Sequence, residues 1–302
     1  MSIVYTEIGS NKRKTAILIA LFLIFIIFTG YIFSKALNMA WILPLVVFFA
    51  SFQAFASYWW SDKITLAISG AHQIKKKDNP ELYRVVENLS ITAGLPMPRV
   101  YVIDDPAPNA FATGRDPSHA VVAATTGLLS KLDKPELEGV IAHEMSHIGN
   151  YDIRLMMVVV VLVGIVVLMA DWFLRFSFFG IGDDDNNSGE LGAVFMVIGI
   201  ILAILSPIFA TLIQLSISRK REFLADADGA LLTRFPEGLA RALEKISADT
   251  VPLKRANKAT AHLYITNPLK EHKGSSRGWF AGLFDTHPPV EERVAKLREM
   301  EE

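Results

Sequence analysis

Four long apolar runs interrupt an otherwise polar chain, and their spacing groups them into two pairs. The runs cover residues 15–33, 40–58, 155–174 and 191–215. A hydrocarbon core about 30 Å thick needs roughly 20 apolar helical residues, so each run is long enough to cross a membrane. The pattern therefore predicts four transmembrane helices in two hairpins, with Trp59 and Trp60 at the water interface after the second span.

The basic residues predict which way the spans face. Ten basic residues near the spans lie on one predicted side of the membrane: Lys12, Arg13, Lys14, Lys63, Lys75, Lys76, Lys77, Arg219, Lys220 and Arg221. The two opposite loops contain Lys35 and Arg175, and the second loop is acidic ("GDDDNNSGE"). Positive charge accumulates on the cytoplasmic side, so both termini and the segment between spans two and three are expected there. A buried core helix remains the alternative for the third run, because Asp171 interrupts its far end.

These assignments divide the chain into four parts. The expected division is an N-terminal hairpin (1–62), a cytoplasmic half (63–152), a second hairpin (153–216) and a second cytoplasmic half (217–302). The composition agrees with a membrane protein, since 51% of the 302 residues are hydrophobic. A transporter or channel is disfavoured because Gln53 is the only strongly polar side chain well inside a span.

Composition also excludes several chemistries. The chain has no cysteine, which removes disulfides, thiolate metal ligands and cysteine nucleophiles. Its net charge of −1 gives no reason to expect nucleic acid as a partner. No G-x-x-x-x-G-K-[ST] phosphate loop occurs, so no nucleotide is expected either.

The first cytoplasmic half mixes helical and strand patterns. "PELYRVVENLSITAGL" is amphipathic and is closed by Gly94 and Pro96, which predicts a helix. The runs "PRVYVID", "NAFATG" and "HAVVAATTGLL" predict a small β-sheet. A second helix is predicted over "DKPELEGVIAHEMSHIGN", where Asp133 and Glu136 fit a capping box and Gly149 is a plausible stop.

The second of these helices contains the pattern H-E-x-x-H. His143 and His147 are four residues apart and project from one helix face. Two imidazoles in this arrangement can bind one Zn²⁺, while Glu144 serves as general base toward the attacking water. The alternative interpretation is a pair of surface histidines.

A third ligand would distinguish these alternatives. The metzincin extension is excluded because Asn150 and Ile153 replace the required Gly and His. A glutamate from another helix is the other common solution, and "SRKREFLADADGALL" after the fourth run offers Glu222, with Asp226 one turn later as a partner for a zinc-bound histidine. The second hairpin would return the helix with His143 and the helix with Glu222 to the same membrane surface. Taken alone, the Glu222 and Asp226 pair is more simply interpreted as the charged face of an amphipathic helix.

The motifs together resemble HtpX-type membrane zinc metalloproteases, in the wider family that includes the CAAX prenyl proteases. The matching stretches are "NAFATG", "VIAHEMSHIGNYD", "SRKREFLADADGA", "HLYITNPL" and "LFDTHPPVEERV". The resemblance implies a mainly α-helical membrane protein with a cytoplasmic α+β, gluzincin-like protease domain and a small sheet. It also implies one Zn²⁺ per chain on His143, His147 and Glu222, with Glu144 as base.

The same resemblance implies an activity and a location. The expected activity is ATP-independent zinc endopeptidase cleavage of misfolded or damaged membrane proteins, as part of stress-linked quality control. The expected location is the plasma (inner) membrane of a prokaryote, with the active site and both termini in the cytoplasm. The lipid bilayer and membrane-protein substrates are then the partners. A zinc-binding membrane scaffold that has lost catalysis is the alternative, and the intact Glu144 argues against it.

Two further motifs are candidates for substrate contacts. "NAFATG" could be an edge strand in which Asn109, Ala110, Phe111 and Ala112 bind a substrate backbone by strand addition, or it could be an ordinary turn and strand. His287 in "THPP" could donate to the oxyanion that forms during amide hydrolysis. A structural histidine is the alternative for His287, and His262 and His272 compete for the same role.

Overall fold

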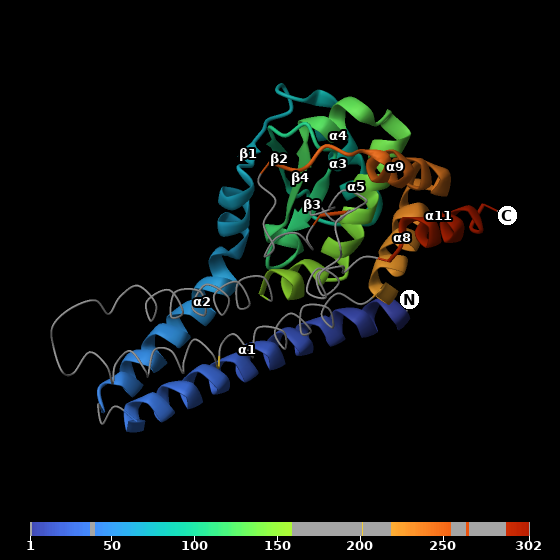
Figure 1. Ribbon diagram of the computed structural model, residues 1–302. Helices are drawn as coiled ribbons and strands as arrows, with labels where there is room; N and C mark the ends of the chain where they lie inside the picture. Colours follow the sequence, from blue (N-terminus) through green and yellow to red (C-terminus); the bar gives the residue numbers. More distant parts are fainter. Residues whose placement is uncertain are drawn as a thin grey trace.

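Two long helices carry an α+β domain at one end of the molecule (Figure 1). The computed structural model describes residues 2–36, 40–158, 201, 219–254, 264–265 and 288–301. Helices α1 (Ser2–Ala36) and α2 (Ile42–Ser69) run antiparallel beside each other, and the N-terminus lies next to the domain (Figure 1). Helix α1 begins 13 residues before the predicted span at residue 15, so its first turns reach the domain.

One stretch of the described residues is long and apolar enough to cross a membrane, namely Leu43–Trp60 in α2. It corresponds to the second predicted span. The first predicted span lies within α1, and the second hairpin falls almost entirely outside the described residues. The four-span arrangement therefore stays a prediction.

The domain contains a four-stranded mixed sheet in the order β1-β2-β4-β3. Strands β2 and β4 pair in parallel, whereas β3 pairs antiparallel with β4 and forms an edge of the sheet. The three predicted β-rich runs are confirmed as β2, β3 and β4, and β1 was not predicted. The strand bounds are His72–Gln73 for β1, Arg99–Ile103 for β2, Ala110–Thr113 for β3 and Val121–Thr125 for β4.

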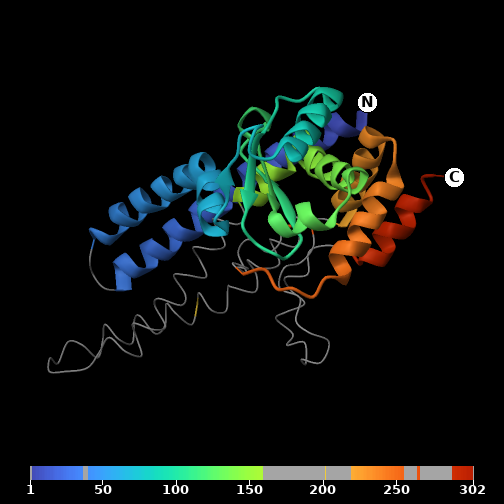
Figure 2. The same cartoon turned by 90° about the horizontal axis from the view of Figure 1, so that it is seen from above.

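Both faces of the sheet are buried, and alternate residues point to different cores. In β4, Val122 and Ala124 join a cluster with helices α3 and α5, whereas Val121 and Ala123 join a cluster with the end of α2. This two-residue alternation is the geometry of a pleated strand. The sheet is therefore a central layer between the helices that carry the site and the long helices α1 and α2, as Figure 2 also shows.

The helices of the domain follow the predicted caps closely. Helix α3 begins after Asn79, whose side chain accepts from the backbone of Leu82, and ends at Gly94 with a φ of 64°. Helix α5 has the predicted capping box between Asp133 and Glu136. The helix bounds are Pro80–Ala93 for α3, Thr126–Lys131 for α4, Lys134–Gly149 for α5, Arg219–Thr233 for α8, Pro236–Ala248 for α9 and Val290–Arg298 for α11.

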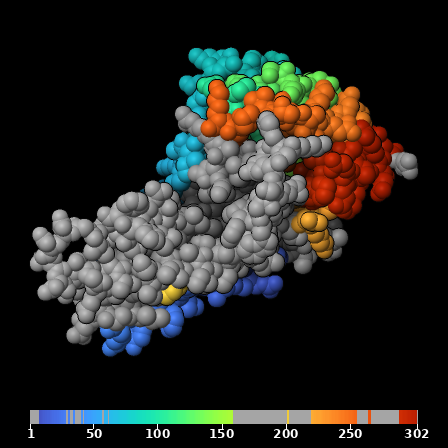
Figure 3. Space-filling model, in the orientation of Figure 1, coloured from blue at the N-terminus to red at the C-terminus, as the bar shows by residue number. Residues whose placement is uncertain are grey.

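Glycines allow α5 to pack very closely against the helices that follow. A Cβ atom added at Gly229 of α8 would lie 3.0 Å from the backbone nitrogen of His143 and 3.2 Å from its Cα. One added at Gly139 of α5 would lie 2.7 Å from the backbone nitrogen of Leu239 in α9. Helix α11 packs beside α9 at the surface (Figure 3), where Arg298 binds Glu237. The backbone of the H-E-x-x-H helix is thus in direct contact with the helix that carries Glu222.

Candidate metal centre

Three side chains from two helices converge on one point. His143 and His147 come from α5 and Glu222 comes from the first turn of α8. One ligand atom from each lies within 4.8 Å of the others, and all three residues are buried. The three residues that the sequence suggested as ligands therefore lie together, and they could hold a metal ion.

The separations of the donor atoms fit a tetrahedral metal site. The two imidazole Nε2 atoms are 3.2 Å apart. The carboxylate oxygens of Glu222 lie 3.9 Å from Nε2 of His143 and 3.6 Å from Nε2 of His147. With metal–ligand bonds of about 2.0–2.2 Å, tetrahedral zinc would separate such donors by about 3.4 Å. The three donors therefore suit zinc with only small adjustments.

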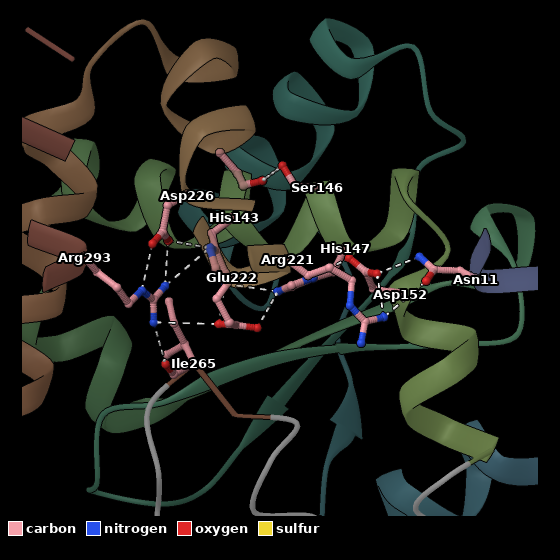
Figure 4. A network of polar contacts seen from close by, with 11 residues as sticks. Asn11, His143, Ser146, His147, Asp152, Arg221, Glu222, Asp226, Ile265 and Arg293 are labelled. Carbon is pink, nitrogen blue, oxygen red and sulfur yellow. Dashed lines mark hydrogen bonds and ion pairs between the residues drawn. The ribbon is translucent and has the colours of Figure 1, made fainter. Parts of the chain in front are cut away.

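Each histidine has a carboxylate on its other ring nitrogen. Nδ1 of His143 lies 2.9 Å from Asp226, and Nδ1 of His147 lies 3.0 Å from Asp152. A carboxylate at this position holds the proton on Nδ1 and leaves the Nε2 lone pair for a metal. Figure 4 shows the two carboxylates on opposite sides of the three donors.

Arg293 of α11 fixes the first of these carboxylates. Its Nε and Nη2 donate to the two oxygens of Asp226 at 2.8 and 2.6 Å, and its Nη1 donates to the carbonyl of Ile265 at 3.2 Å. Burial alone would raise the pKa of Asp226, but the arginine outweighs it and lowers that pKa to about 2. Asp226 is therefore a fixed anion that orients His143.

The pKa values of the other groups follow from burial and neighbouring charge. Burial of Glu144 raises its pKa, and the Glu222 carboxylate adds to the increase. Burial would lower the pKa of His147, but the hydrogen bond to Asp152 and the charge of Glu222 outweigh it and raise the pKa to about 9. A glutamate with a raised pKa is suited to accept and return a proton near neutral pH.

The edge strand β3 runs beside the H-E-x-x-H helix. The backbone of Ala112 partly offsets the rise in the pKa of Glu144, which places this residue next to the candidate base. At Ala110, the carbonyl accepts from the backbone of Ile265 at 3.0 Å, and Phe111 packs edge-to-face against Tyr264. Asn109 precedes the strand and bonds to Thr125 of β4. The predicted edge position is confirmed, and the chain itself pairs with the edge at Ala110.

Sequence reasoning missed several of the buried polar groups. These are Asn11, Asp152, Arg221 and Arg293. One signal was present for Arg293, which lies on the apolar stripe of α11 formed by Val290, Val294 and Leu297, where a charge requires a buried partner. The candidate oxyanion donor His287, and its competitors His262 and His272, lie outside the described residues.

Two histidines one helical turn apart, a glutamate between them and a third donor from a following helix define a metallohydrolase of the H-E-x-x-H class. Comparison with known proteins identifies its family. The model of peptidase family M48 matches residues 76–301, so the chain belongs to this family and is a metalloprotease.

The relatives extend this similarity to the whole chain. A "Protease HtpX homolog" of Tropheryma whipplei (strain Twist) is 47% identical over 296 residues, covering 98% of both chains. A "Protease HtpX homolog" of Dictyoglomus thermophilum is 46% identical, covering 99% of this chain and 95% of the relative. The crystal structure of S. mikatae Ste24p shares the fold with a TM-score of 0.50 at 17% identity, covering 98% of this chain and 67% of that one.

Proposed function

We propose that the protein is a membrane-embedded zinc endopeptidase that cleaves misfolded or damaged membrane proteins at the cytoplasmic face of a prokaryotic plasma membrane. The observation that carries the proposal is the convergence of His143, His147 and Glu222 within 4.8 Å, with Glu144 buried beside them. Family membership supports proteolysis as the reaction. The apolar α2 stretch, the remaining apolar runs and the basic flanks support a membrane location with cytoplasmic termini.

The proposed roles follow from the chemistry of each side chain. His143, His147 and Glu222 hold zinc, which when bound acidifies water and polarises a carbonyl. Glu144 takes the proton from the attacking water and passes it to the leaving amine. Its buried position and raised pKa suit both transfers. His287 is proposed as the donor to the developing oxyanion.

Substrate is proposed to pair with the edge strand β3. An extended peptide added to this edge would be recognised through its backbone, which suits a protease with many unfolded substrates. The proximity of the Ala112 backbone to Glu144 supports a scissile bond positioned opposite Ala112. The contact between Ile265 and Ala110 means that a substrate strand has to replace this contact or stop short of it.

Cleavage of a membrane protein in detergent tests the proposal. Purified protein should cleave an unfolded model membrane protein without ATP, lose activity with a chelator and regain it with zinc. Glu144→Gln is the matched control, because it changes one oxygen to nitrogen and should leave the ligands in place. Cleavage that persists in Glu144→Gln, or in excess chelator, would contradict the proposed mechanism.

A further inference from the structure

The first helix of the chain contributes a buried side chain to the surroundings of the metal centre. Asn11 of α1 is 0% exposed, although it lies in the polar run "GSNKRK". Its Nδ2 donates to Asp152 at 2.8 Å and to the carbonyl of Asn150 at 2.9 Å. Its Oδ1 accepts from Arg221 at 3.2 Å (Figure 4). The amide therefore uses both its donor and its acceptor.

These bonds fix one oxygen of the carboxylate that orients a candidate metal ligand. Oδ1 of Asp152 accepts from Asn11 and, at 3.2 Å, from Arg221. Its other oxygen faces Nδ1 of His147 at 3.0 Å. A carboxylate held at one oxygen cannot rotate freely, so its second oxygen remains directed at the imidazole. A continuous chain of contacts thus runs from α1 through Asp152 to His147.

The turn immediately before Asp152 is strained and is held by the same helix. Tyr151 has a φ of 60°, a left-handed conformation that is unfavourable for a non-glycine residue. Such a conformation persists where its surroundings impose it. The ammonium group of Lys12 lies 4.3 Å from the centre of the Tyr151 ring, next to the Asn11 bonds. Two consecutive residues of α1 therefore hold this turn in place.

We propose that Asn11 is a positioning residue that couples the docking of α1 to the geometry of the metal centre. Removing its amide would leave Arg221 as the remaining donor to Oδ1 of Asp152, and so would loosen His147 and weaken metal binding without touching a ligand. This inference rests on the proposed metal site, and its function would be to make a fully formed centre depend on a correctly seated first helix. An asparagine suits this position because an aspartate would repel Asp152, whereas an apolar residue would leave Arg221 and Asp152 without a shared partner.

Zinc affinity measured by chelator competition tests the proposal. Asn11→Leu should raise the Kd for zinc by roughly tenfold, the low end of the effects of groups that orient metal ligands. Asp152→Asn should raise it by at least as much. In the double variant the two effects should not add, since Asn11 acts through Asp152.

Matched variants separate this role from a general effect on folding. Thr15→Val changes another buried side chain of α1, which bonds to the carbonyl of Asn11, and should keep the parental Kd. Asn11→Asp keeps the shape and the acceptor for Arg221 but replaces the donor to Asp152 with an acceptor, so it should bind zinc more weakly. Thermal unfolding of the metal-free variants reports any loss of folding separately. The visible spectrum of the Co²⁺-substituted protein should shift in both Asn11 variants, which reports ligand geometry independently of activity.

The outcomes are distinguishable from failure of the proposed function. A parental Kd in both Asn11 variants, or additive losses with Asp152→Asn, would overturn the coupling while leaving the zinc protease intact. Absence of zinc binding in the parent protein would instead overturn the metal site itself. Weakened, non-additive binding with an unchanged Thr15→Val control is the result that the coupling requires.

Discussion

Substitution of Gly229 tests whether the contact between α5 and α8 sets the position of the third ligand. A Cβ at this position would lie 3.0 Å from the backbone nitrogen of His143, whereas atoms in good contact lie about 3.5–4.0 Å apart. Both helices are buried here, so one backbone has to move by about 0.5 Å. Glu222 lies on α8 together with Gly229, so a shift of this helix would move the ligand. Metal–ligand distances tolerate changes of only about 0.2 Å.

The expected cost of Gly229→Ala follows from two opposing effects. Overpacking costs about 1–3 kcal/mol, and alanine gains about 1 kcal/mol over glycine in a helix. The net loss of unfolding free energy should be about 1 kcal/mol, and the Kd for zinc should rise by roughly tenfold, as for a displaced ligand support. Thermal unfolding of the metal-free protein and chelator competition measure the two effects separately.

Gly149→Ala is the matched control on α5. Its added Cβ would lie 3.6 Å from a methyl group of Leu95, an ordinary contact. This variant should keep the parental zinc affinity and be equally stable or slightly more stable, because the helix gain is not opposed. If Gly229→Ala behaves like Gly149→Ala in both measurements, close packing of the two helices does not position Glu222.

Three further predictions concern the outer contacts, the protonation state and the topology. Arg293→Lys should weaken zinc binding by about tenfold, because lysine cannot make the bidentate contact with Asp226. Arg298→Lys on the exposed face of α11 should keep the parental zinc affinity, and equal losses in the two variants would contradict the role of Arg293. Because the pKa of His147 is raised to about 9, the metal-free protein holds a proton there at neutral pH and loses it as the pH rises through about 9. Apparent zinc affinity should therefore increase by up to about tenfold per pH unit between pH 7 and 9 and then level off, and a flat profile would be inconsistent with this proton. A reporter at Asp184 should be extracytoplasmic and one at Glu302 cytoplasmic; both on one side would remove the second hairpin.

The sequence predicts most of the local structure, because local signals determine it. The capping box at Asp133, the stop at Gly94 and the β-rich runs act within a few residues of one another. Sheet order was not predictable, since it depends on pairing between distant segments, and β1 has only two residues, His72–Gln73. The edge position of β3 was one of two interpretations that the sequence left open, and the assembled sheet decides between them.

The candidate ligands and one of their supports, Asp226, were predictable from spacing, whereas the other supports, Asn11, Asp152 and Arg293, were not. His143 and His147 are one turn apart, and the predicted second hairpin was expected to return Glu222 to the same surface. Asn11 lies 141 residues before its partner Asp152, in a run whose charge is typical of a solvated helix start. Its burial results from the seating of α1 against the turn after α5. Polar contacts of this kind depend on tertiary structure and have no local sequence pattern.

The zinc content of two glutamate variants tests the central assignment most directly. Elemental analysis of purified Glu144→Gln should give one zinc per chain with no peptide cleavage, because this residue moves protons and does not hold the metal. Glu222→Gln should lose both zinc and cleavage, because a negative donor is removed, and Asp226→Asn should retain an intermediate amount. If Glu222→Gln binds zinc as tightly as the parent protein, the third ligand is elsewhere and the proposed centre is wrong.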